Sequence, residues 1–126
     1  MRNWVLGLLL SLIVLATFFR ATDFDFVTYD DAAHIYFNDY HRPVTAKSFE
    51  RYWLRPFQGL FVPVTYSFWA LQTKIDPRFN PKIYHTANLV VHWLNVLLVF
   101  GILCMLAPKA AFWGALLFGL HPIQVE

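Results

Sequence analysis

The sequence has 126 residues, of which 58% are hydrophobic, 19% are aromatic and 14% are charged, with a formal net charge of +2. Soluble domains carry about 25% charged residues, and here the apolar residues form long blocks, so the composition indicates a membrane protein. The small net charge argues against a nucleic acid partner, and the single cysteine, Cys104, excludes an internal disulfide framework.

The first apolar block covers residues 4–19 and predicts a membrane span. At ~1.5 Å per residue a helix of this length reaches roughly 24 Å, against ~30 Å for the hydrocarbon core of a bilayer. Arg2 and Arg20 can snorkel from its ends, and Trp4 is typical of an interfacial anchor. A cleaved signal peptide is the alternative, but the small-residue cleavage site that it requires does not follow the block. We therefore predict an uncleaved anchor.

Residues 20–82 form a long loop with patterns of short interfacial helices. Thr45 is suited to cap a helix that ends near Pro56. One predicted face of this helix is aromatic: Phe49, Tyr52 and Trp53. Another face is basic, with residues that recur every four positions: Lys47, Arg51 and Arg55. Such a helix is typical of the membrane interface, and the apolar stretch 63–71, too short to span, predicts a second surface-lying or re-entrant helix.

The aromatic and basic faces leave two interpretations open. The aromatic residues can form an interfacial belt or a platform for a sugar ring or a lipid headgroup. The basic residues can contact ordinary anionic lipid, which we favour, or the phosphate of a lipid-linked substrate.

Two further apolar blocks, residues 83–106 and 110–120, predict a second span and an incomplete third span. Asn80-Pro81 is a good helix start, with asparagine as the cap and proline at the first helical position. The block 110–120 covers about half a bilayer at ~1.5 Å per residue. The chain stops at Glu126 without a polar tail, so we expect that it is truncated.

Positive charges in the short flanks predict the orientation of these spans. Arg2 precedes the first span and Lys109 lies in the turn between the second and third, so both are expected in the cytoplasm. The loop holds eight of the ten Lys and Arg residues, but the rule weakens for loops beyond ~60 residues. Alternating spans then place five ionisable residues on the outer side: Asp30, Asp31, His85, His121 and Glu126.

The adjacent carboxylates of Asp30 and Asp31 are candidates for chemistry. They repel one another, which favours proton uptake by one of them, and such a group is suited to take a proton from a hydroxyl. The alternative is a solvated acidic pair that caps a helix beginning at Ala32.

The second span carries a polar stripe with spacings of three and four residues: His85, Asn88, His92 and Asn95. Hydrogen bonding between helices is the favoured role for the deeper His92 and Asn95, whereas His85, near the outer end, is better placed for a site. No metal site is predicted, because His85 and His92 lie two turns apart. His121 and Glu126 form either a proline-terminated helix end or, through Glu126, a partner of the acidic pair.

Several motifs in order resemble one protein family: Phe26-Val27-x-Tyr29-Asp30-Asp31, Pro63-Val64-Thr65-Tyr66, Tyr84-His85-x-x-Asn88 with His92 and Asn95, and Leu117-Phe118-x-Leu120-His121-Pro122-x-x-Val125-Glu126. Together they resemble the start of a membrane O-mannosyltransferase, most closely the group with tetratricopeptide repeats and its bacterial relatives.

The resemblance implies an all-α, multi-helix glycosyltransferase of the C-type fold. Such enzymes transfer a sugar from a polyprenyl-phosphate donor to a hydroxyl of a protein or glycan acceptor on the outer or lumenal side, with inversion and without a cofactor. Asp30 and Asp31 match the catalytic acids, with Asp30 the preferred general base. Three residues would line the pocket: His85, His121 and Glu126.

This sequence departs from the family pattern at Val62, where relatives often have arginine, so Arg51 or Arg55 would supply the phosphate contact. It also departs at Gln124, where a second histidine is often found. We expect the 126 residues alone to be inactive. The compact loop favours a bacterial inner membrane over the endoplasmic reticulum. The alternative function is a non-enzymatic multi-pass scaffold or transporter fragment, in which the polar stripe only packs helices.

Overall fold

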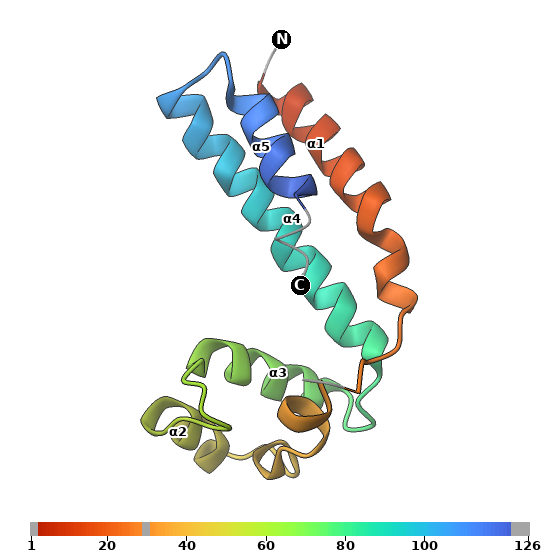
Figure 1. Cartoon of the computed structure of the whole chain (residues 1–126), viewed down its shortest axis with the longest axis vertical. Coiled ribbons are helices and arrows are strands. Elements are labelled where there is room, and N and C mark those ends of the chain that lie inside the picture. Colours follow the sequence, from red (N-terminus) through yellow and green to blue (C-terminus); the bar gives the residue numbers. More distant parts are fainter. Residues whose placement is uncertain (1–2, 29–30, 122–126) are drawn as a thin grey trace. The chain divides into compact units, whose positions relative to one another are not determined.

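The computed structural model describes residues 3–28 and 31–121, and in this part of the chain all the regular elements are helices, without strands. The predicted all-α class is confirmed. In chain order the elements are α1 (Asn3–Phe18), η1 (Phe19–Asp23), η2 (Ala32–Tyr36), η3 (Asp39–His41), α2 (Ala46–Leu54), α3 (Pro63–Ile75), α4 (Pro81–Leu106) and α5 (Ala111–Leu120) (Figure 1). The chain divides into a loop unit, Asp23–Tyr84, and a helical unit formed by the segments on either side of it.

Two helical segments are long and apolar enough to cross a membrane, judged by length and composition. One is Asn3–Asp23, in which η1 continues α1 for a total of 21 residues, and the other is α4 with 26 residues. The predicted third span corresponds to α5, which has only 10 residues. At ~1.5 Å per residue, α5 reaches about half the thickness of the hydrocarbon core.

The helical unit packs through small residues and a side-chain hydrogen bond between α1 and α4. Figure 1 shows α1, α4 and α5 side by side, and their shared core contains Leu10, Phe100, Ala111 and Ala115. The Trp93 indole donates from α4 to a serine hydroxyl on α1 at 2.8 Å. Close approach through small side chains with a few hydrogen bonds is how helices associate in a bilayer.

Two aromatic clusters form the core of the loop unit. The first is centred on Tyr52, Tyr66 and Ala70, where α2 meets α3. The second is centred on Ile35, Phe79 and Tyr84. The half-buried Trp69 contacts both clusters and so joins them into one core.

The aromatic face predicted for α2 is divided between core and surface. Tyr52 is only 1% exposed and stacks on Tyr66 with ring centroids 5.2 Å apart. Phe49 packs against the same cluster, whereas Trp53 is exposed. The prediction that the three residues share a membrane-facing surface is therefore wrong for Tyr52, because α3 covers that side of α2.

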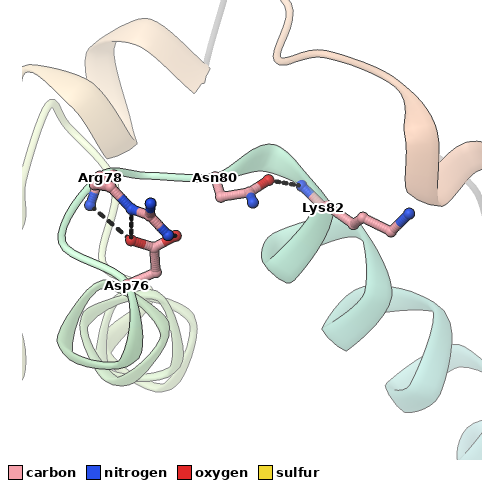
Figure 2. Close-up of polar contacts among 4 residues, drawn as sticks. All are labelled: Asp76, Arg78, Asn80 and Lys82. Atoms are coloured by element: carbon pink, nitrogen blue, oxygen red, sulfur yellow. Dashed lines mark hydrogen bonds and ion pairs between the residues drawn. The ribbon is translucent and has the colours of Figure 1, made fainter.

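Side chains close the connection between α3 and α4 (Figure 2). The Asp76 carboxylate accepts hydrogen bonds from the backbone N–H of Arg78 at 3.0 Å and from its Nε at 2.9 Å. These bonds to Arg78 lower the pKa of Asp76. Two residues further on, Asn80 Oδ1 accepts from the Lys82 N–H at 3.1 Å, and Pro81 begins α4. The start predicted from Asn80-Pro81 is confirmed.

Candidate functional site

Asp31 closes the turn that follows the Phe26-Val27 motif. Its Oδ2 atom accepts a hydrogen bond from the Val27 N–H at 3.0 Å, and η2, a single π-helical turn, begins at the next residue. The side chain is half-buried. One carboxylate oxygen of Asp31 is therefore engaged in holding the loop. Asp30, its predicted catalytic neighbour, lies outside the described residues, as does Glu126.

A histidine that the sequence did not single out ties this segment to α3. His34 lies on η2, and its Nδ1 atom is 2.8 Å from the hydroxyl of Tyr66. Tyr66 is 1% exposed, and burial raises its pKa, so the hydroxyl remains a neutral hydrogen-bonding group at physiological pH. The contact anchors the backbone just after the acidic pair. The signal that could have found His34 is its position three residues after Asp31, about one helical turn away.

Three of the four motifs meet in the loop unit. Phe26, from the first motif, packs edge-on against Tyr84, from the third, with ring centroids 5.2 Å apart. The Tyr84 hydroxyl lies 2.7 Å from Thr73 Oγ1 on α3, the helix on which Tyr66, from the second motif, anchors His34. Residues distant in the sequence therefore hold the chain both before and after the acidic pair.

An open cavity of about 480 Å³ lies beside this segment. Its lining includes Asp25, Thr28 and three aromatic residues, Phe26, Tyr36 and Phe37. Aromatic faces with a few polar groups are typical of small-molecule sites. Asp25 was not singled out from the sequence, since its position in the loop matches no motif spacing.

The two arginines proposed to contact phosphate have different environments. Arg51 donates to the Tyr40 hydroxyl at 3.3 Å and to the Pro56 carbonyl at 3.2 Å, and its guanidinium lies over the Tyr40 ring. Arg55 follows the last residue of α2 and is exposed. Arg51 therefore holds the end of α2 in place, while Arg55 presents its charge to the surroundings.

The predicted site residues His85 and His121, from the third and fourth motifs, lie in the helical unit. His85 is half-buried near the start of α4, and His121 is exposed at the end of α5. Deeper in α4, His92 Nε2 lies 2.9 Å from the Gly119 carbonyl of α5, and its ring packs edge-on against Phe18. The predicted hydrogen bonding between helices is confirmed for His92, whereas Asn95 is exposed.

Among residues 3–28 and 31–121, no cluster of three or more His, Cys, Asp or Glu residues could hold a metal ion. Comparisons with known protein families, with curated proteins and with solved structures found no match to this chain.

Proposed function

We propose that this protein is an integral-membrane glycosyltransferase that transfers a monosaccharide from a polyprenyl-phosphate donor to a hydroxyl acceptor. The membrane placement is supported by Asn3–Asp23 and α4, which are long and apolar enough to span. Both carry large apolar side chains on their surfaces, among them Leu12, Leu98 and Met105, as expected of helices that contact lipid.

The observation that carries the enzymatic proposal is the meeting of three motifs around the acidic segment. The contact of Phe26 with Tyr84 holds the chain four residues before Asp30, and that of Tyr66 with His34 holds it three residues after Asp31. Catalytic groups require this kind of support, because small displacements of a reacting group lower the rate strongly. The motif order resembles that of O-mannosyltransferases, which supports the choice of donor and reaction.

In the proposed reaction the acceptor oxygen attacks the anomeric carbon of the sugar. A new carbon–oxygen bond forms, the bond to the phosphate oxygen breaks, and polyprenyl phosphate leaves with the electron pair. Asp30 accepts the hydroxyl proton as general base. Asp31, with one oxygen bound to the Val27 N–H, positions the loop. Arg55, His85, His121 and Glu126 complete the proposed substrate-binding set, while Arg51 supports it through α2.

The test uses the complete gene product, reconstituted with a radiolabelled polyprenyl-phosphate sugar. Asp30→Asn is expected to lower transfer by ~10²–10⁴-fold, as loss of a general base does. Asp31→Asn is expected to have a smaller effect, because the amide oxygen can still accept from the Val27 N–H, whereas Asp31→Ala cannot. Unchanged transfer in Asp30→Asn and Asp31→Asn at normal expression would refute the catalytic assignment.

The second candidate function is a non-enzymatic membrane scaffold. The contact of His92, a residue of the polar stripe, with Gly119 joins α4 to α5, and the contact of Trp93 with Ser11 joins α4 to α1. A scaffold requires only such packing contacts between its helices. The scaffold hypothesis predicts that Asp30→Asn and Asp31→Asn have no effect on the role of the protein. The same two variants therefore separate the two candidate functions.

A further inference from the structure

A group of exposed apolar side chains lies in the loop unit where α2 ends and α3 begins. It consists of six side chains that are between 38% and 69% exposed: Trp53, Leu54, Leu60, Phe61, Val62 and Val64. We name these residues the apolar tip. Scattered apolar residues are normal on a protein surface, but a group gathered at one turn marks an interaction site.

The tip is built on a rigid turn. Phe57 and Leu60 exchange two backbone hydrogen bonds of 2.9 Å each. Between them, Gln58 and Gly59 both have positive φ, at 49° and 81°, as in the two-residue type I′ turn of a β-hairpin. The Trp53 indole donates to Ser67 Oγ at 3.1 Å and ties α2 to α3. The apolar side chains therefore project from a fixed backbone.

The charged residues within this stretch of the sequence are basic. From residue 51 to residue 75 there are three, Arg51, Arg55 and Lys74, and the charged residues that flank the stretch, Glu50 and Asp76, are acidic. Arg55 is exposed and directly follows Leu54, a residue of the apolar tip, in the sequence. Exposed apolar side chains beside cationic groups match the two layers of a bilayer surface, where acyl chains lie below anionic headgroups.

We propose that the apolar tip inserts into the headgroup region of a bilayer that contains anionic phospholipid. Trp53 would lie at the interface, which amphipathic aromatic residues favour. Leu54, Leu60 and Phe61 would enter the upper acyl region, and Arg55 would contact lipid phosphate. The membrane contact thus lies at the end of α2 and not along its side, where Tyr52 is buried. This proposal requires a membrane protein but no transferase activity.

The test places an environment-sensitive fluorophore on the complete protein in nanodiscs that contain phosphatidylglycerol. In a Cys104→Ser background, the label is attached at Phe61→Cys or, in a second variant, at Leu60→Cys. Ala46→Cys is the matched control, since Ala46 is exposed at the other end of α2. We expect nitroxide lipids to quench the labels at 60 and 61 and aqueous iodide to quench the label at 46.

Two results would overturn the proposal. Quenching of the tip labels by iodide would place the tip in water, and protection from both quenchers would mean that protein covers it.

The charge requirement is tested separately. Arg55→Gln is expected to lower the ratio of inserted to free tip about fivefold, the effect of one basic residue near an anionic surface. Lys47→Gln, at the far end of α2, should change it little, and equal quenching in purely zwitterionic nanodiscs would exclude anionic recognition.

Discussion

At the scale of single residues, buried polar side chains determine how the loop unit responds to pH. His41 is 1% exposed, and its Nδ1 lies 3.3 Å from the Ile35 carbonyl. Burial lowers the pKa of His41, and the backbone carbonyls of Ile35 and Tyr66 offset part of that effect. The folded unit therefore keeps this imidazole neutral at pH values where the unfolded chain would protonate it.

His41 predicts a loss of stability in mild acid. An unfolded histidine titrates near ~6.5, so below that pH the unfolded state binds more protons than the folded state, and stability falls as the pH falls. Thermal unfolding can be followed by near-UV circular dichroism, since all six tyrosines lie between residues 29 and 84. We expect the midpoint of thermal unfolding to be lower at pH 5.5 than at pH 7.5. His41→Phe should remove most of this pH dependence, despite the lower stability of that variant. His121→Gln should retain it.

The hydrogen bond between His34 and Tyr66 makes a second prediction at this scale. Tyr66→Phe keeps the ring in its cluster and removes only the hydroxyl that lies 2.8 Å from His34. A double-mutant cycle with His34→Ala should give a coupling free energy of roughly 0.5–1.5 kcal/mol, the usual net value of a hydrogen bond. A coupling near zero in chemical unfolding would mean that the contact does not anchor η2 to α3.

At the scale of elements, glycines on α5 determine how closely the helices of the helical unit approach. A Cβ atom at Gly119 would lie 2.9 Å from one methyl of Val96 and 3.1 Å from a methyl of Val14. Valine side chains are stiff at χ1, so they cannot move aside easily. A Cβ at Gly114 would meet only Leu103 Cδ1, at 2.8 Å, which is the end of a flexible side chain.

These neighbours predict opposite results for two substitutions of the same kind. Gly119→Ala should destabilise the packing of α5 by about 1–3 kcal/mol through overpacking. The ~1 kcal/mol by which alanine is more favourable than glycine in a helix offsets part of this loss. Gly114→Ala should be neutral or stabilising. Unfolding of the two variants by sodium dodecyl sulfate in mixed micelles measures the difference, and equal stabilities would show that Gly119 is not a close contact.

The sequence was sufficient where the determinants are local. Asn80 and Pro81 predicted the start of α4 because cap chemistry depends on adjacent residues, and the apolar blocks predicted the two long helices. It was insufficient where a neighbour distant in the sequence decides the outcome. Periodicity placed Tyr52 and Trp53 on one face of α2 but could not show that α3 covers Tyr52. His34 and Tyr66 are 32 residues apart, so their contact had no local signal.

At the scale of the whole molecule, the two long apolar helices and the charges beside them predict a membrane topology. The loop unit lies between Asn3–Asp23 and α4 in the chain, so two spans would place it on the side opposite to the N-terminus. Arg2 and Lys109 flank the spans on short segments and favour the cytoplasm. The proposed reaction with an outer-leaflet polyprenyl donor requires the same arrangement, because the acidic pair must face the donor's sugar.

Cysteine labelling tests this topology directly. In a Cys104→Ser background, Glu50→Cys marks an exposed position of the loop unit and Ala110→Cys an exposed position between α4 and α5 that leaves the charge of Lys109 in place. We expect a membrane-impermeant maleimide to label position 50 in intact cells or spheroplasts, and to label position 110 only after the membrane is permeabilised. The reverse pattern would place the acidic pair in the cytoplasm and exclude an outer-face transferase. Labelling of both positions in intact cells would mean that α4 does not cross the membrane.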